Sequence, residues 1–503
     1  MSPNRGAPTP PIAFTAGPAT VRNHIGARFV ETDDKLLARL RGVCDDVTTD
    51  PSARAEAGRD WWPLAMGWAL DGEVPGLAAV VVRPREVDEV AGVLAVCDEA
   101  RVPVTHAAGR SGVCGASVPL HGGVVLDVCA LAGIVDVDDV SMVLDVRPGT
   151  FGDVLEDDLR ALHGVTLGHW PQSIELSTVG GWLACRSAGQ YSTRYGKIED
   201  MVAGLQVVLA DGRVVRTGGA PRAAVGPDLT QVFVGSEGTL GVITEAWLRV
   251  HPVPAAERRA AFGFASFGDG LAACRRVLRR GATPAVLRLY DTTESARNFE
   301  VPDQHVLLVL DEGEPAIIDA MMQVVGEECE GAKRLDDALV GRWLEHRNDV
   351  SALESLTQRR IVVDTIEIAA RWSALPAIYE GVLAAVAGLE HALVVSAHQS
   401  HAYGDGACLY FTFAGRPPDE EGPAGRDAFY RAAWDVATHV VLAHGGALSH
   451  HHGVGLNRGR FVRDALGPAF DVLAALKGAL DPNGILNPGK LGLPDPFGEV
   501  PWP

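Results

Sequence analysis

The sequence lacks the apolar segments that membrane-spanning proteins need. No hydrophobic run reaches the roughly 20 residues that cross a bilayer, although hydrophobic residues make up 47% of the 503-residue chain. The first residues, MSPNRGAPTPP, do not contain the apolar core of a secretory signal. We therefore expect a cytoplasmic protein with no integral membrane association.

The cysteines lack the spacings that bind metals. They form no CxxC pair and no set with zinc-site spacing. The eight are Cys44, Cys97, Cys114, Cys129, Cys185, Cys274, Cys329 and Cys408. This pattern predicts reduced, mostly buried thiols and no metal site.

Positive charge is also scarce. The chain has 64 acidic and 44 basic residues, a net charge of -20. Such a charge repels the phosphates of nucleic acids and anionic lipids. We exclude nucleic acid as a partner, expect a small-molecule substrate and leave a homodimer open. The length predicts two or three structural units, with a site between two domains.

Helix and strand patterns divide the chain near residue 254. The apolar run at 77–84 predicts a buried strand, and the spacing of apolar residues after it predicts a helix. A second predicted strand ends at AAGRSG, so the three elements form a β-α-β unit. Further strands are predicted at 124–128, 142–149 and 305–313, a helix at 151–162, and a hairpin with an Asp-Gly turn at 205–218. Beyond Pro254 longer helices alternate with strands.

Three glycine-rich segments lie between the strands of the first half. In AAGRSGVCGAS (107–117) the backbone can turn sharply, so that its N–H groups converge on an anion such as a pyrophosphate. A plain glycine-rich turn is the alternative. The GxGxxG spacing of a Rossmann turn is absent, which argues against a nicotinamide cofactor. The other two segments, at 169–202 and 234–248, combine glycines with serine and threonine hydroxyls.

The motifs PQSIELSTVGGW, PRAAVGPD and GSEGTLGVITEAWLRVHPVP resemble the FAD-binding domain of the vanillyl-alcohol-oxidase or PCMH type over residues 70–255. The resemblance implies two α+β subdomains that bury an extended FAD, with the ADP phosphates on the first two loops. It also implies a set of lining residues in four segments. These are His106, Ala107, Ala108, Gly109, Arg110, Ser111 and Gly112; Gln172, Ser173, Ile174, Glu175, Leu176, Ser177 and Thr178; Cys185, Arg186, Ser187 and Ala188; and Glu237, Gly238, Thr239, Leu240, Gly241, Val242 and Ile243. Because GRSGVCGAS contains no histidine, we expect non-covalent FAD.

The second half has a dense cluster of histidines. His450, His451 and His452 are consecutive and cannot all face one way in a helix or strand, so a loop is predicted. The loop is either solvated and metal-scavenging, or an acid–base and anion-binding loop over a cofactor. The local sequence leaves both open.

Three further side chains are candidates for chemistry. Tyr410 alternates with the apolar Leu409 and Phe411 and therefore projects to the opposite face of a strand, although such a tyrosine is usually in the core. Arg288 within an apolar strand requires an anion or a carboxylate nearby. Arg347, on a helix, is a weaker candidate. We expect cations near Tyr410 to stabilise its phenolate form.

The segments SHHHGVG, CLYF and LRL resemble the alkylglycerone-phosphate synthase branch of this flavoprotein family. The resemblance implies that Tyr410 is the acid–base catalyst, that His450, His451 and His452 lie near flavin and substrate, and that Arg288 and Arg347 serve substrate binding, Arg288 also activity. The branch exchanges an acyl group on dihydroxyacetone phosphate for a fatty alcohol, with the substrate held at the flavin N5 and no net oxidation.

Two alternatives remain open. An FAD-linked 2-hydroxy-acid dehydrogenase or oxidase, of the D-lactate or glycolate type, fits the ending LDPNGILNPGKLG, but GDGACLYF lacks the metal-binding histidine of that branch's GDGNLH segment. A flavin-binding protein without catalysis is the third hypothesis.

The predicted fold class is α+β. We expect a mobile arm at 1–30, a two-subdomain PCMH-type FAD domain at 31–254, a cap or substrate domain at 255–465 and a C-terminal segment at 466–503 that returns to the FAD domain. The cap is expected to be an antiparallel sheet with helices on one side.

Overall fold

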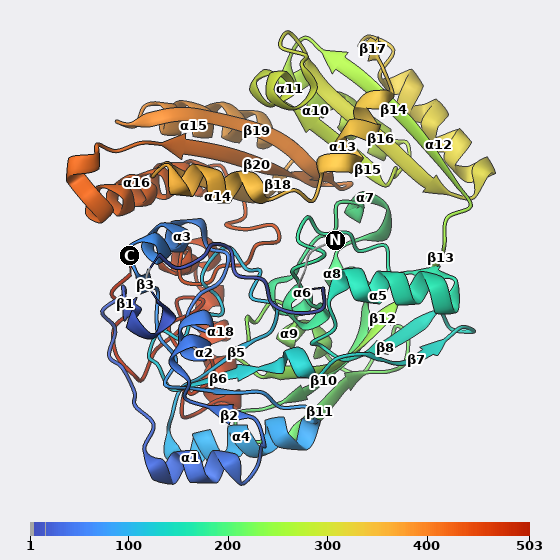
Figure 1. Cartoon of the computed structure of the whole chain (residues 1–503). Helices are drawn as coiled ribbons and strands as arrows, with labels where there is room; N and C mark the ends of the chain where they lie inside the picture. Colours follow the sequence, from blue (N-terminus) through green and yellow to red (C-terminus); the bar gives the residue numbers. More distant parts are fainter. Residues whose placement is uncertain (1–4, 16, 503) are drawn as a thin grey trace.

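The computed structural model describes residues 5–15 and 17–502. The chain forms two sheet-containing units that lie side by side, and a third unit, the cap, that lies over them (Figure 1). None of the helices in the described ranges is both long enough and apolar enough to cross a membrane.

The first unit confirms the predicted β-α-β pattern. Its sheet has the order β2-β4-β6-β5, and β4, β6 and β5 are parallel. Helix α4 connects β4 to β5 and shares a core with α1. The elements of this unit are α1 (Asp34–Arg41), β2 (Val47–Thr48), α2 (Pro51–Glu56), α3 (Pro63–Leu70), β3 (Glu73–Val74), β4 (Val80–Val82), α4 (Val87–Ala100), β5 (Val104–Ala107) and β6 (Val124–Asp127).

The second unit is an antiparallel sheet in the order β11-β10-β12-β8-β7. The predicted hairpin is confirmed as β10 and β11, and the predicted helix at 151–162 as α5 with a π-helical turn over Leu159–His163. The elements are β7 (Ile134–Asp138), β8 (Val143–Val146), α5 (Gly152–Asp158), β9 (Val165–Thr166), α6 (Val179–Cys185), α7 (Ser192–Tyr195), α8 (Ile198–Met201), β10 (Val202–Val208), β11 (Val214–Gly218), α9 (Thr230–Phe233), β12 (Val242–Arg249) and β13 (His251–Pro252).

The cap contains a seven-stranded antiparallel sheet in the order β17-β14-β16-β15-β19-β20-β18. Its strands are β14 (Ala256–Phe264), β15 (Val286–Tyr290), β16 (His305–Gly313), β17 (Lys333–Leu335), β18 (Val362–Arg371), β19 (Ala392–Ala402) and β20 (Gly406–Gly415). Its helices are α10 (Phe267–Arg279), α11 (Thr292–Phe299), α12 (Pro315–Glu328), α13 (Ala338–His346), α14 (Ser351–Gln358), α15 (Leu375–Ala387) and α16 (Gly422–Ala443).

Helices pack on both faces of the cap sheet, which corrects the expectation of helices on one side. Helices α10, α12, α15 and α16 share one core with the sheet. Helices α11 and α13 pack against its other face at β14, β15 and β16. The reason is that successive residues of β15 and β16 are apolar on both faces, such as Val286 beside Leu287 and Leu307 beside Leu308.

The cap sheet begins at Ala256, and the chain turns back toward the first unit before residue 465. Strand β13 still pairs with β9 of the second unit, and the cap sheet starts at Ala256. On the way back, Ala447 bridges Ala369 of the cap, and the Leu456 N–H already donates to the Cys114 carbonyl of the first unit. The crossing therefore lies between 447 and 456, not at 465, because the glycine-rich histidine segment runs as a loop between the units.

The remaining C-terminal segment packs on the first two units. Helices α17 (Val462–Leu466) and α18 (Ala469–Leu480) lead into a loop in which Leu486 bridges Val104 of β5. The described part of the N-terminal arm is also packed: Ile12 is buried beside Met66, and β1 (Arg22–Asn23) pairs with β3. This differs from the free arm that the composition predicted, because scattered apolar residues find pockets on the first unit.

Candidate functional site

Polar side chains collect on the face of the cap sheet that points toward the two lower units. Leu409 and Phe411 pack into the core under α10 and α15, so Tyr410 between them points the other way. The same alternation places Arg288 of β15 and Glu367 of β18 on that face. The sheet thus carries its charged groups over the glycine-rich loops.

Tyr410 is hydrogen bonded to the histidine segment. Its hydroxyl lies 2.8 Å from Nε2 of His452, and its ring stacks on His398 with the centroids 5.0 Å apart. Burial raises the pKa of Tyr410 above its usual value, and burial also lowers the pKa of His452 to about 4. Both groups are therefore neutral, and one hydrogen bond joins the tyrosine hydroxyl to the imidazole. The expected phenolate is not favoured, because burial and the neighbouring Glu367 and Asp364 raise the pKa of Tyr410.

Arg288 is held by a series of hydrogen bonds through His398 to Glu294, which the sequence did not predict. It donates from Nη2 to Nε2 of His398 over 2.8 Å, and Nδ1 of His398 donates to Glu294 over 2.8 Å. Burial lowers the pKa of His398, so the imidazole is neutral and its tautomer is fixed by its two neighbours. His398 lies between the Glu294 carboxylate and the Arg288 guanidinium, so the carboxylate does not pair with Arg288 directly. The guanidinium can therefore bind an anion.

Arg347 and Arg288 both contact Trp343. The guanidinium carbons of both lie 5.6 Å from the ring of Trp343, and that of Arg347 also lies over Trp170 and Tyr191. Within the described residues, Nη1 of Arg347 and Nε1 of Trp170 are buried donors without an acceptor. Two buried donors without acceptors fit a ligand rich in acceptor oxygens.

The histidine segment forms a second cluster around His401. Nε2 of His450 forms a hydrogen bond with the Tyr403 hydroxyl over 3.0 Å. Nδ1 of His450 lies 2.9 Å from Nδ1 of His451. Ser192 of α7 joins Tyr403 to His401. One ring nitrogen from each of His401, His450 and His451 lies within 4.8 Å of the others, a spacing that can hold one metal ion. The sequence had predicted no metal site, because His401 is separated from the other two by a whole helix and strand.

Two buried carboxylates hold the backbone of the histidine segment. Glu367 accepts from Ser449, from the N–H groups of His450, His451 and His452, and from Arg458. Glu237 accepts from the N–H groups of Val454 and Gly455. Neither Glu367 nor Arg458 was among the predicted site residues, since a lone glutamate in a strand looks like an edge or surface residue.

The glycine-rich loops meet below the cap. A Cβ on Gly109 would overlap the Leu176 carbonyl, which brings the first and second loops into contact. A Cβ on Gly238 would overlap the His106 ring, which brings the third loop against the first. Three of the four predicted lining segments therefore converge on one another.

Several predicted lining side chains have other partners. The Ser177 hydroxyl donates to the Ser173 carbonyl, and Thr178 caps α6. Leu240, Val242 and Ile243 pack into the hydrophobic cores. In other residues of the set the side chain is exposed, as in Gln172 and Glu175, or paired, as in Arg110 with Asp127 and Arg186 with Glu199. The small residues of the set, Ala107, Ala108, Ser111, Gly112, Thr239, Gly241, Cys185, Ser187 and Ala188, lie in the same four segments.

Buried polar atoms without partners surround the loops. Within the described chain they include Oδ2 of Asp60, Nδ1 of His169, Oδ1 of Asn487 and the side-chain amide of Asn457. Asn487 donates to the carbonyls of Ala116 and Glu237, so it joins the first loop to the third. Such atoms need hydrogen-bond partners, and a cofactor with phosphate, ribityl and ring polar groups supplies them. The loops therefore fit FAD.

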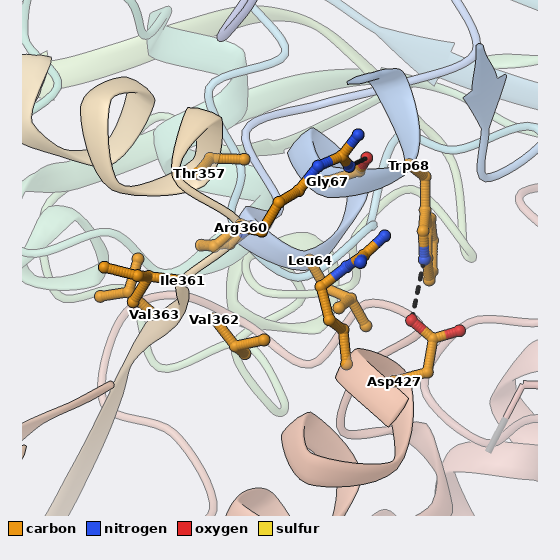
Figure 2. Close-up of a pocket in the computed structure, with 11 residues that line it drawn as sticks. Leu64, Gly67, Trp68, Thr357, Arg360, Ile361, Val362, Val363 and Asp427 are labelled. Atoms are coloured by element: carbon orange, nitrogen blue, oxygen red, sulfur yellow. Dashed lines mark hydrogen bonds between the residues drawn. The ribbon is translucent and has the colours of Figure 1, made fainter. Parts of the chain in front are cut away.

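A separate cavity of about 20 Å³ lies between α3, α14, β18 and α16. Leu64, Trp68, Arg360 and Val362 line it, and Trp68 donates to Asp427 over 2.9 Å (Figure 2). It holds little more than a water molecule, and it contains none of the candidate site residues. It is a contact between the cap and the first unit and not the functional site.

Comparison with known proteins agrees with this geometry. Residues 78–218 match the model of an FAD binding domain, and residues 253–491 that of the C-terminal domain of FAD linked oxidases. An FAD-linked oxidoreductase of unassigned activity, YgcU of Escherichia coli K12, is 32% identical over 437 residues, which cover 82% of this chain and 89% of YgcU.

Two relatives with named activities are similar over comparable lengths. Alkyldihydroxyacetonephosphate synthase of Dictyostelium discoideum is 29% identical, covering 84% of this chain and 74% of the synthase. Glycolate oxidase subunit GlcD of Bacillus subtilis is 29% identical, covering 82% and 88%. A solved alkyldihydroxyacetonephosphate synthase superposes with a TM-score of 0.79 at 25% identity, over 98% of this chain and 91% of that one. The chain is a member of the FAD-linked oxidase family and an FAD-dependent enzyme.

Proposed function

We propose that this enzyme exchanges the acyl group of an acylated dihydroxyacetone-phosphate-like substrate for a fatty alcohol, as the alkyldihydroxyacetonephosphate synthases do. One observation carries the proposal: the neutral Tyr410–His452 pair and the cationic Arg288 share one face of the cap sheet. The first can move a proton, and the second can bind a phosphate. The similarity to the synthases supports the same conclusion.

The proposed roles follow from the contacts. Tyr410 exchanges a proton with the reacting carbon or oxygen of the substrate, and His452 at 2.8 Å takes up or returns that proton. Arg288 and Arg347, with the Trp170 N–H, bind the phosphate in a site where their charges are partly buried. FAD supplies an electron-deficient ring against which the substrate is held. The fatty acid leaves, the alcohol enters, and no net oxidation occurs.

The proposal is tested on the yellow holoprotein without oxygen. Acyl-dihydroxyacetone phosphate and a fatty alcohol are supplied, and in a parallel sample D-2-hydroxy acids are supplied instead. We expect an ether-linked product in the first sample and no bleaching of the flavin in the second. Bleaching by a hydroxy acid without any ether product would overturn the proposal.

A second candidate function is a 2-hydroxy-acid dehydrogenase. The observation that favours it is the His401–His450–His451 cluster, whose ring nitrogens are spaced for a divalent metal. The similarity to glycolate oxidase subunit GlcD is its other support. The two candidates differ in their response to a chelator: the exchange reaction is expected to survive treatment with EDTA, whereas the dehydrogenase would lose its metal and its activity.

We also infer that FAD is bound without a covalent bond. The first loop contains no histidine, and the buried His106 ring is packed against Gly238. Precipitation with acid should release all of the flavin into the supernatant. Flavin that stays with the protein pellet would show a covalent attachment.

A further inference from the structure

The histidine segment 449–455 carries the three consecutive histidines from the cap to the lower units. The backbone of Gly453 and Gly455 is left-handed, with φ of 80° and 54°. A loop of this kind has little rigidity of its own. Something else must fix the position of His452 against Tyr410.

From the cap side, Glu367 fixes the first half of the segment. Its Oε1 accepts from the Ser449 hydroxyl over 2.7 Å and from the His452 N–H over 2.9 Å, and its Oε2 accepts from the N–H groups of His450 and His451. Arg458 donates to the same carboxylate over 2.9 Å. Burial acts to raise the pKa of Glu367, but the charge of Arg458 outweighs it and holds that pKa well below its usual value.

From the lower units, Glu237 fixes the second half. Its Oε1 lies 2.5 Å from the Val454 nitrogen and its Oε2 lies 2.8 Å from the Gly455 nitrogen. The Glu237 side chain is buried, and its own φ of 46° is unusual for a residue other than glycine. Backbone strain and the burial of a carboxylate both cost free energy. We therefore infer that the position of this carboxylate serves a purpose.

The two carboxylates belong to different parts of the fold. Glu367 is in the middle of β18, while Glu237 is in the third glycine-rich loop, beside Gly238 and the His106 ring. The backbone of Glu237 also accepts from Asn487 over 2.7 Å. The histidine segment is therefore attached at one end to the cap sheet and at the other end to the loops that fit FAD.

We propose that Glu237 and Glu367 are positioning residues that together fix the histidine segment over the cofactor, and that Glu237 is not a ligand of FAD. This inference rests on the proposed function for the role of His452, but not for the existence of the two attachments. It differs from the expectation that Glu237 lines the FAD site, and the experiment below distinguishes the two. It also explains why the third loop carries a glutamate in a left-handed conformation.

The experiment compares three glutamate-to-glutamine variants of the holoprotein: Glu237→Gln, Glu367→Gln and, as a matched control, Glu312→Gln. Glu312 is a buried cap carboxylate that also contacts a lower unit, by accepting from Tyr195 over 2.7 Å. Hydrogen–deuterium exchange of the amides in 449–455 is measured together with the amount of bound FAD. Turnover per bound FAD, with kcat and KM separated, is the functional readout.

We expect each substitution to release its own half of the segment. In Glu367→Gln the amides of 450–452 should exchange at least about tenfold faster, and in Glu237→Gln those of 454 and 455, because each loses hydrogen bonds to a charged acceptor. Both variants should keep FAD at the wild-type ratio and lose kcat at nearly constant KM. The control should change none of these readouts.

Two results would overturn the inference. If Glu237→Gln loses FAD while turnover per bound FAD stays normal, Glu237 is a cofactor ligand. If exchange in 449–455 is unchanged in both variants, the segment is fixed by other contacts. Failure of the proposed function is separate, since an inactive wild-type protein still yields the exchange rates and the FAD content.

Discussion

The hydroxyl of Tyr410 lies 2.8 Å from Nε2 of His452, although the two residues reach this contact from different parts of the chain, a cap strand and the loop that leaves the cap. The contact joins two neutral groups in a buried site. Tyr410 therefore carries a proton that it can give to a substrate, and His452 lies within hydrogen-bond reach to exchange a proton with it in turn.

Replacing Tyr410 with phenylalanine should remove this proton transfer. We expect turnover to fall by about two to four orders of magnitude, the usual contribution of an acid–base group. FAD content and the melting temperature should stay near the wild-type values, since only one hydroxyl is lost. The control is Tyr379→Phe, a cap tyrosine that stacks on Phe267 away from the site. Unchanged turnover in Tyr410→Phe would support the hypothesis of a flavin-binding protein without catalysis, or a different catalyst.

Arg347 should govern the affinity for the substrate's phosphate. Arg347→Ala removes a buried donor that lacks an acceptor in the protein, so we expect KM to rise by about one to two orders of magnitude, the worth of a charged hydrogen bond. The control is Arg342→Ala in helix α13, which ends just before Arg347; it removes a 3.3 Å contact to the Phe299 carbonyl. A KM that is equal in both variants would place the phosphate elsewhere.

Gly238→Ala should disrupt the cofactor site. The added Cβ would overlap the buried His106 ring, and the backbone φ of 68° disfavours alanine. We expect the purified variant to lose most of its yellow colour and to melt at a lower temperature. Gly326→Ala, in helix α12, has open space around the new methyl group and serves as the control. Full FAD content in Gly238→Ala would contradict the convergence of the first and third loops.

His24 should make stability depend on pH. It lies between Glu73 at 2.8 Å and Asp427 at 3.2 Å, and it ties the N-terminal arm to cap helix α16. Burial opposes protonation, but the two carboxylates outweigh it and raise the pKa of His24 above its ordinary value. Since the raised pKa belongs to the folded state, the stabilisation is complete below the unfolded value near 6.5. It is lost as pH rises through the folded value.

The test compares melting temperatures of the wild type and His24→Gln at pH 5.5 and pH 8.5. We expect the variant to be less stable at the lower pH and the difference to shrink at the higher pH. His163→Gln, at an exposed helix end, is the control. A difference that grows with pH would contradict the charged contact.

Local patterns predicted much of the fold and part of the site. The alternation around Tyr410 and Arg288 correctly placed both on the polar face of the cap sheet, because side-chain direction in a strand depends only on near neighbours. The glycine-rich loops were found for the same reason, since tight backbone contacts require glycine.

The contacts that hold the site were not predictable in this way. Glu367 acts on residues 449–458 from more than 80 positions away, and nothing in TIEIAAR distinguishes it from a surface glutamate. Glu294 and His398 are likewise joined only by the register of strands and helices far apart in sequence. The expected phenolate of Tyr410 was wrong because burial, which a sequence does not give, and the neighbouring Glu367 and Asp364 all raise its pKa.

The most direct test of the central claim is the transfer of a labelled fatty alcohol by the holoprotein. Isotope-labelled hexadecanol and acyl-dihydroxyacetone phosphate are mixed with the enzyme without oxygen, and the phosphate-containing products are separated. The account predicts label in an ether-linked product, release of an equal amount of fatty acid, and no label with Tyr410→Phe. Release of no fatty acid, together with bleaching of the flavin by a D-2-hydroxy acid, would contradict it.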